Sequence, residues 1–251
     1  MTLEDIYNSL SFGELRMLFM SGKSIDGPTT EGMPVATFLQ LLPSIQLGLT
    51  ELYKRFSLSE GHFKLVRVDG VDTYHIKELY SMSANPNGAM LYIDDTEMPL
   101  QNNLLKLLRC YGTQNDRSIE IPMNQIANPA AIRTTSYNSM TVPNDPVAAP
   151  WLVQTPEIEV VYRANHPEIN KYIANEAPLI TDIYLPPSHL EALLYYVASR
   201  VFNPIGMVPD SVHEGNNYAQ KFEVACQRLS MENYQVDQDA ENEKLAFRGF
   251  C

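Results

Sequence analysis

Helical spacing at both ends of the chain, with β-type alternation between them, is the sequence feature that most restricts the fold. Residues 34–57 and 188–203 place apolar side chains three and four positions apart, as amphipathic helices do. From residue 61 the pattern changes to a period of two. Each helical stripe needs a partner to bury it, and the opposite end of the chain supplies one. The sequence therefore predicts an α+β fold, in which N- and C-terminal helices form one helical body with a β-rich insertion.

Two helix-start signals lie near the N-terminus. In Thr2-x-x-Asp5 and in Ser11-x-x-Glu14, a hydroxyl and a carboxylate are spaced to satisfy backbone N–H groups at a helix start. Residues 21–33 are rich in Gly, Ser, Thr and Pro and are predicted to form a loop.

The long apolar stripe of residues 34–57 contains Pro43 and Gly48. Proline removes a backbone donor and clashes with the preceding turn, so we expect either a kink or a helix that begins at Pro43. Glycine inside a helix costs about 1 kcal/mol relative to alanine. The stripe comprises Phe38, Leu41, Leu42, Ile45, Leu49, Leu52, Tyr53 and Phe56.

The middle of the chain contains several strand candidates. "HFKLVRV" and "VDTYHI" flank Asp69-Gly70 and are predicted to form a hairpin. "LLKLLRCYG" and "RSIEIPM" flank "TQND" as a second hairpin, although the leucine-rich half could also be a helix. "TSYNSMTVP" and "EIEVVYR" are further strands, with long loops near 82–103 and 143–156.

Two more helices are predicted near the C-terminus. The first starts at Ser188-x-x-Glu191, and Pro204 and Gly206 end it. The second starts at Ser211-x-x-Glu214, and its apolar stripe is Tyr218, Phe222, Ala225, Cys226 and Leu229. Residues 235–244 are acidic and polar. The expected organisation is 1–57 and 186–235 as the helical body, 58–185 as the β-rich insertion and 236–251 as an extended tail.

Charge and cysteine content restrict the partners and the compartment. The net charge is −12, so the chain lacks the overall positive charge that tight nucleic-acid binding usually needs, although an acidic wall can let DNA slide past. The three widely spaced cysteines indicate reduced thiols in a cytosolic compartment. The acidic N-terminus does not resemble a secretory signal, and no apolar run has the roughly 20 residues of a membrane span.

The motif Tyr92-Ile93-Asp94-Asp95 has the Y-x-D-D form of reverse transcriptase metal sites. Two-metal chemistry there needs a third carboxylate on a neighbouring strand. The upstream candidates Asp69, Asp72 and Glu78 lie at or just after a predicted turn. A metal-dependent nuclease or polymerase-like enzyme that uses Asp94 and Asp95 is therefore the alternative hypothesis, and an acidic turn is favoured over it.

Other catalytic patterns are incomplete. "MLFMSGKS" at 17–24 ends like a phosphate-binding loop, but Met17 replaces its first glycine. The five histidines lack zinc-ligand spacing, and His189 is expected in the exposed first turn of a helix. We therefore expect no catalytic residues and no metal site, although a pair of acidic residues that the fold brings together would not be visible as a spacing.

The helix 188–203 is apolar around much of its circumference. Tyr195 and Tyr196 lie about 100° apart on a helix, so together with Leu193 and Leu194 they widen the apolar face. A helix of this kind is buried on two sides, and in a small helical body the second side suggests a neighbouring subunit. The predicted subunit interface comprises Leu193, Tyr195, Tyr196 and Arg200.

Four stretches, in order, resemble one protein family. They are "LLPSIQLGLTELYKRFSL", "SYNSMTVP", "EVVYRANHPEI" and "IYLPPSHLEALLYYVASRVFN". Over about residues 1–235 the chain is similar to the head-to-tail adaptors of short-tailed bacteriophages, also called tail tubular protein A-like or connector proteins. The resemblance rests on the order and combination of these stretches, since none of them is a catalytic motif.

The resemblance implies a structural virion protein without enzymatic activity or cofactor. Such adaptors form a ring, usually of twelve copies, between the portal protein and the tail nozzle, and double-stranded DNA passes through the lumen without sequence-specific binding. The helical part makes the ring body and the β part usually meets the tail. The implied location is the head-to-tail junction of the virion, after assembly in the bacterial cytoplasm.

The last residues form a separate prediction. "LAFRGFC" regains two aromatic side chains after the acidic stretch, and aromatic residues in such a place often anchor a contact. Leu245, Phe247, Arg248 and Phe250 are therefore expected to contact the portal or another partner. A third hypothesis for the whole chain is a tail-associated binding module, with the β insertion as its contact surface.

Overall fold

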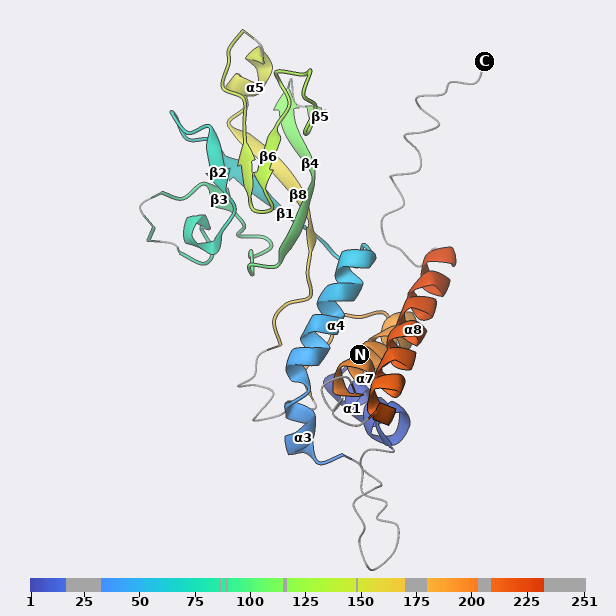
Figure 1. Ribbon diagram of the computed structural model, residues 1–251. Helices are drawn as coiled ribbons and strands as arrows, with labels where there is room; N and C mark the ends of the chain where they lie inside the picture. The colour runs from blue at the N-terminus through green and yellow to red at the C-terminus, as the bar shows by residue number, and fades with distance from the viewer. Residues whose placement is uncertain are drawn as a thin grey trace, which may run out of the picture. The chain divides into compact units, whose positions relative to one another are not determined.

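The computed structural model describes residues 1–16, 33–85, 87–88, 90–114, 117–147, 149–169, 180–202 and 209–232. It divides into two compact units (Figure 1). One unit combines Met1–Leu58 with Glu168–Cys251 and is helical, and the other is Ser59–Pro167 and consists mainly of strands. The chain is thus a mixed helix and sheet protein, as the sequence predicts.

The N-terminal start signal is present but the second one is not. The Asp5 carboxylate accepts hydrogen bonds from the Thr2 backbone N–H at 2.8 Å and from the Thr2 hydroxyl at 3.2 Å. Helix α1 (Leu3–Ser9) then continues into the π-helix η1 (Leu10–Glu14), so the predicted start at Ser11 is wrong. The buried Ser11 hydroxyl instead accepts a hydrogen bond from the Met33 N–H at 2.6 Å.

The stripe of residues 34–57 forms two helices, α3 (Val35–Leu39) and α4 (Leu42–Arg55). Pro43 lies in the first turn of α4, where an N–H would have no partner within the helix. This is the second of the two predicted alternatives. The buried side of α4 comprises Leu42, Ile45, Gly48, Leu49, Leu52 and Tyr53.

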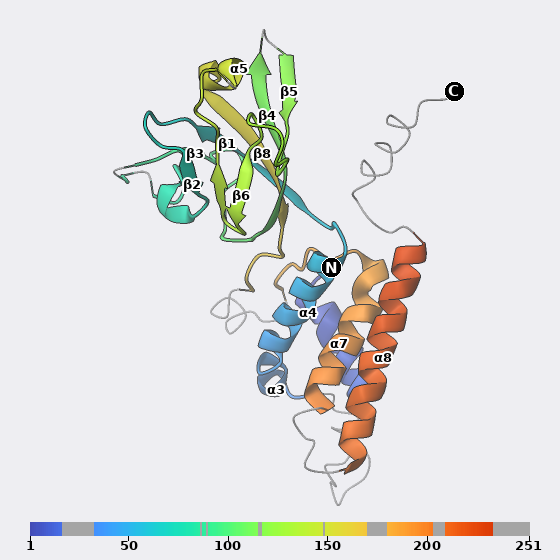
Figure 2. The same ribbon diagram turned by 45° about the horizontal axis from the view of Figure 1, so that its top comes forward.

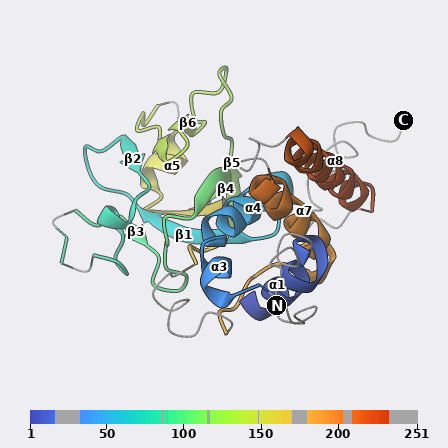
Figure 3. The same cartoon turned by 60° about the horizontal axis from the view of Figure 1, so that its bottom comes forward.

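Helix α7 (Leu190–Phe202) lies between the other helices of its unit. Helix α8 (Pro209–Met231) packs along one side of α7, and α1, η1 and α4 contact it elsewhere (Figures 2 and 3). The two-sided burial predicted for this helix is therefore met within the chain and does not by itself require a neighbouring subunit. The core of this unit includes Leu3, Ile6, Leu10, Ile45, Leu49, Leu52, Leu193, Val197 and Phe202.

The starts of the two C-terminal helices differ from the prediction. Ser188 does not cap α7 but lies in the 3-10 turn η3 (Pro187–His189), and its hydroxyl hydrogen-bonds to Nδ1 of His189 at 3.1 Å. Helix α8 begins at Pro209, two residues before the predicted Ser211. Its predicted stripe is correct, because Phe222, Ala225, Cys226 and Leu229 are buried and Tyr218 is partly buried.

The strands of the second unit form two antiparallel sheets. The five-stranded sheet has the order β3-β1-β8-β4-β5, and the three-stranded sheet has the order β2-β7-β6. The strands are β1 (Glu60–Val66), β2 (Thr73–His75), β3 (Ile93–Asp94), β4 (Leu104–Gln114), β5 (Arg117–Ile121), β6 (Arg133–Ser136), β7 (Ser139–Thr141) and β8 (Glu157–Ala164). Two short helical elements, η2 (Glu78–Tyr80) and α5 (Pro150–Gln154), lie between strands, and β3 and α5 occupy parts of the predicted long loops.

One hydrophobic core joins the two sheets. Alternate residues of β8, from Ile158 to Ala164, are buried at the centre of the larger sheet. Tyr74 of β2 and Met140 of β7 come from the smaller sheet and belong to the same buried cluster as Phe63 and Leu65 of β1. This unit therefore has its own core, separate from the helical one.

The second predicted hairpin is confirmed, whereas the first is wrong. Strands β4 and β5 pair with Cys110 opposite Ile121, so the leucine-rich segment is a strand and not a helix. Strand β1 pairs with β8 and β3, and β2 pairs with β7 in the other sheet. Gly70 does adopt a positive φ of 77°, so the chain turns there. The turn does not lead into a β1–β2 pair, because β2 pairs with β7 in the smaller sheet.

The boundaries between the units lie after Leu58 and after Pro167. The sequence places them after residues 57 and 185. The difference at the second boundary concerns Ile183 and Leu185, which are buried and belong to the helical unit. The backbone N–H of Leu3 donates to the Thr181 carbonyl at 2.8 Å, which ties this segment to the N-terminal helix.

Candidate binding groove in the helical unit

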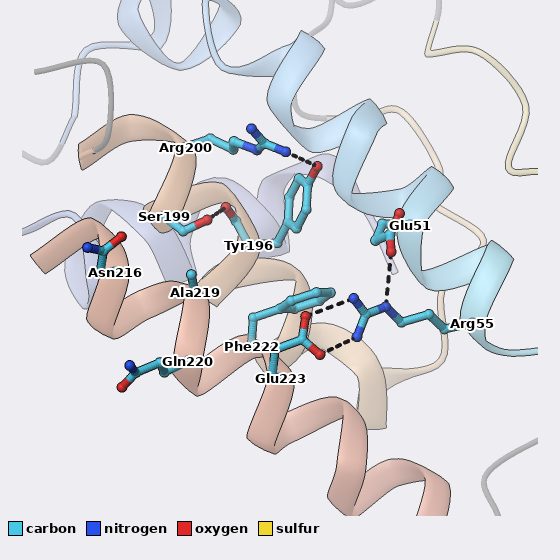
Figure 4. Close-up of a pocket in the computed structure, with 10 residues that line it drawn as sticks. All are labelled: Glu51, Arg55, Tyr196, Ser199, Arg200, Asn216, Ala219, Gln220, Phe222 and Glu223. Carbon is cyan, nitrogen blue, oxygen red and sulfur yellow. Dashed lines mark hydrogen bonds and ion pairs between the residues drawn. The ribbon is translucent and has the colours of Figure 1, made fainter. Parts of the chain in front are cut away.

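A groove of about 660 Å³ opens between α4, α7 and α8, a volume typical of ligand clefts. Helices α4 and α8 each pack on α7, and long side chains span the space between them (Figure 4). The lining residues are Glu51 and Arg55 from α4, Tyr196, Ser199 and Arg200 from α7, and Asn216, Ala219, Gln220, Phe222 and Glu223 from α8.

An ion-pair cluster closes one end of this groove. The Arg55 guanidinium donates to both carboxylate oxygens of Glu223, at 2.6 and 2.8 Å, and to the Glu51 carboxylate at 3.0 Å. Hydrogen bonding to Arg55 lowers the pKa of the Glu223 carboxyl. Two carboxylates therefore neutralise Arg55, and the cluster ties the end of α4 to the middle of α8.

Aromatic rings form the floor of the groove. The Tyr196 and Phe222 rings meet edge to face with centroids 5.3 Å apart, and the Arg55 guanidinium lies 4.8 Å from the Phe222 ring centroid. Helix α4 comes close to this floor at Gly48. A Cβ atom there would lie 2.7 Å from Leu193 Cδ1 and 2.9 Å from Tyr196 Cδ1, so glycine permits the close helix packing.

The residues predicted as a subunit interface divide between core and surface. Leu193 is fully buried inside the helical unit, and Tyr195 is partly buried with its hydroxyl donating to Glu191 at 2.8 Å. Tyr196 and Arg200 line the groove. The interface assignment stays a prediction, and only the exposed parts of these side chains are available to it.

The Y-x-D-D motif forms a structural clamp in the β unit. Asp95 is 1% exposed, and its carboxylate accepts hydrogen bonds from the Ser81 hydroxyl at 2.7 Å and from the Ser83 hydroxyl at 2.6 Å. The backbone N–H groups of Ser83 and Leu100 also donate to it, at 3.1 and 2.7 Å. Burial alone would raise the pKa of Asp95, but these hydrogen bonds outweigh burial and lower that pKa.

The remaining motif residues have local structural contacts. The Tyr92 hydroxyl donates to the His75 carbonyl at 2.8 Å and accepts from the His75 N–H at 3.0 Å, linking the neighbourhood of β3 to β2. The Asp94 carboxylate accepts from the Thr96 hydroxyl at 2.8 Å. Within the described ranges, no group of three or more His, Cys, Asp or Glu side chains could hold a metal ion.

The predicted exposure of His189 is wrong. The His189 side chain is 1% exposed and packs edge to face on Phe56, with ring centroids 4.9 Å apart. Its Nε2 atom is buried without a hydrogen-bond partner, and burial lowers the pKa of the ring. His189 lies in the 3-10 turn η3 and its side chain is buried. The sequence Pro-Pro-Ser-His does not by itself indicate that burial.

Several predictions concern residues outside the described part of the chain. They are the phosphate-loop-like end of "MLFMSGKS", the helix stop at Pro204 and Gly206, the acidic stretch 235–244, and Leu245, Phe247, Arg248 and Phe250. Among the helices that the structure describes, none combines the length and apolar character needed to cross a membrane.

No protein-family model matches this chain, and no curated protein sequence is similar to it. The groove was not predicted from the sequence as a site. Its ion-pair cluster joins residues 168 positions apart, and only the packing of α4 and α8 on α7 brings them together.

Proposed function

We propose that this chain is a structural ring component of the head-to-tail junction of a short-tailed bacteriophage. In this proposal about twelve copies sit between the portal protein and the tail nozzle, and packaged DNA passes through the lumen. The observation that carries the proposal is the insertion of a β unit, Ser59–Pro167, between the two halves of one helical unit. This organisation agrees with what the resemblance implies for such adaptors.

The net charge and the hydrogen bonding of Asp95 support the same role. A net charge of −12 suits a channel wall along which DNA slides, because it offers few cations to hold phosphates. The Y-x-D-D alternative loses support, since the Asp95 carboxylate is already occupied by hydroxyl and amide donors. We further propose that Leu245, Phe247, Arg248 and Phe250 reach the portal or another partner.

Assembly with portal tests the proposal. The purified chain is mixed with the portal protein of the same phage, and mass is measured by light scattering after size-exclusion chromatography. The expected product is the portal ring plus about twelve copies of this chain, visible as a second ring by electron microscopy. A chain that stays monomeric and does not bind portal contradicts the proposal, whereas a monomer observed without portal does not, because assembly can require the portal surface.

A further inference from the structure

The open end of the groove presents a cation without an acidic partner. The Arg200 side chain is exposed, donates to the Tyr196 hydroxyl at 3.2 Å and lies over the Tyr196 ring at 5.2 Å. In the part of the chain that the structure describes, no carboxylate forms an ion pair with Arg200. At the other end Arg55 is neutralised by Glu51 and Glu223. The groove therefore favours a ligand whose negative charge lies at its Arg200 end.

The polar lining suits an extended peptide segment. Asn216 and Gln220 line the groove from α8, and their amide side chains can both donate to and accept from a backbone, whereas the Ser199 hydroxyl already donates to the Tyr196 carbonyl at 2.7 Å (Figure 4). The Tyr196 ring and the small side chain of Ala219 offer apolar contact to alternate residues of such a segment. The site thus combines one cation, hydrogen-bonding amides and an aromatic surface.

The chain itself contains a segment of this composition, directly after α8. Residues 233–243 are "NYQVDQDAENE", with four carboxylates at Asp237, Asp239, Glu241 and Glu243 and no cation. Because the chain has 30 Asp and Glu residues but 18 Lys and Arg residues, acidic segments are common in it and a cation such as Arg200 is the scarcer partner. Arg200 is one of only 18 Lys and Arg residues in the chain, and the groove leaves it open.

The segment is long enough to reach Arg200 from its own helix. The groove lies beside Asn216 to Glu223 of α8, and α8 ends at Met231. At 1.5 Å per residue, Asn216 is about 23 Å along the helix from that end. An extended chain covers roughly 3.3 Å per residue, so the nine residues from Asn233 to Glu241 span about 30 Å. The tether also gives the segment a local concentration in the millimolar range, which favours the same copy over another.

We propose that the acidic segment 236–243 docks in the groove between α4, α7 and α8 of its own chain, antiparallel to α8, with a carboxylate on Arg200. This contact gives Arg200 an ion-pair partner within the chain, in place of the neighbouring subunit that the sequence suggests. It also fixes where the last residues, 245–251, leave the helical unit. The inference does not depend on the phage assignment, because it uses only the groove and the adjacent sequence.

Photo-crosslinking in the full-length chain tests the docking. A photoreactive p-benzoylphenylalanine replaces Gln220, which lines the groove, and in a control it replaces Arg228, which is exposed on α8, nearer to the segment and outside the groove. After irradiation at micromolar protein, mass spectrometry locates the crosslinks. We expect position 220 to crosslink to residues 236–243 within monomers, with a higher yield than position 228 despite the longer tether.

Charge-reversal variants provide a second test of the docking. Arg200→Glu should lower the crosslink yield at position 220 by about threefold or more, the size expected for losing one exposed ion pair and adding repulsion. Arg228→Glu, the matched charge control, should leave that yield unchanged. Circular dichroism confirms that both variants fold. A position-220 yield no higher than that of position 228, a yield insensitive to Arg200→Glu, or a crosslink found only in dimers would each overturn the proposal.

Discussion

At the scale of single residues, buried polar groups carry the clearest consequences. Asp95 and His189 are both about 1% exposed, yet their surroundings differ. Asp95 is held by Ser81, Ser83 and the Leu100 backbone, so its charge is compensated inside the fold. His189 has only Ser188 on Nδ1 and nothing on Nε2, so a charge on this ring would be poorly compensated.

His189 should therefore make the helical unit sensitive to acid. Burial lowers the pKa of the folded side chain, so the unfolded chain binds the proton more tightly. The stability that comes from neutral His189 is complete above the unfolded pKa of about 6.5 and is lost as the pH falls below it. Urea unfolding followed at 222 nm should show a shallower loss of stability between pH 7 and pH 5 in His189→Leu than in the parent chain.

The exposed His75 provides the matched control for this measurement. His75→Leu makes the same replacement at an exposed position, so it reports any effect of exchanging histidine for leucine that does not come from burial. If the free energy of unfolding fell equally steeply with pH in the parent and in His189→Leu, the role assigned to His189 would be contradicted. The sequence could not reveal this residue, because helical spacing alone placed His189 at an exposed position, whereas it lies in a 3-10 turn that buries its side chain.

At the scale of elements, local patterns predicted the helices and most strands, whereas pairing required the fold. Pro43 correctly marked the start of α4, and the stripe from Phe222 to Leu229 correctly marked the buried side of α8. The prediction of a β1–β2 hairpin was wrong, because a turn at Gly70 is compatible with a following strand in either sheet. The groove could not be predicted either, because the sequences of α4 and α8 do not indicate that Arg55 forms an ion pair with Glu223.

The Arg55–Glu223 pair should couple α4 to α8 modestly. The bidentate geometry is favourable, but the side chains are 32% and 54% exposed, so water screens the interaction. A double-mutant cycle with Arg55→Met and Glu223→Gln should give a coupling free energy of about 0.5–1 kcal/mol at low salt, with a smaller value at 0.5 M salt. A coupling above about 3 kcal/mol, or one that salt does not change, would show that the pair behaves as a buried one.

At the scale of the whole molecule, the sequence predicted the mixture of helix and sheet, whereas the unit boundary after Pro167 does not follow from it. Periodicity located a β-rich insertion between helical ends, because the change from 3.6 to 2 residues per repeat is visible in one sequence. No such change marks residue 167, since residues 168–185 contain no long periodic segment. There, burial of Ile183 and Leu185 and the Leu3–Thr181 hydrogen bond assign the segment to the helical unit.

The β unit should therefore fold when it is excised at the structural boundary. Both of its sheets and its hydrophobic core lie within Ser59–Pro167. Its two ends also meet, because the Ala164 N–H donates to the Ser59 carbonyl at 3.0 Å, so excision leaves adjacent termini as in many independent domains. A fragment of residues 59–167 should unfold cooperatively in urea and give a dispersed proton–nitrogen NMR spectrum.

A second fragment, which ends at the boundary expected from the sequence, is compared with the first in stability and solubility. Residues 58–185 add Ile183 and Leu185, which are buried against the helical unit in the full chain and would be exposed in this fragment. The longer fragment should gain no free energy of unfolding and should be less soluble, because exposed apolar side chains favour association. If it were instead more stable than 59–167 by more than about 1 kcal/mol, a change well outside the scatter of surface additions, residues 168–185 would belong to the β unit.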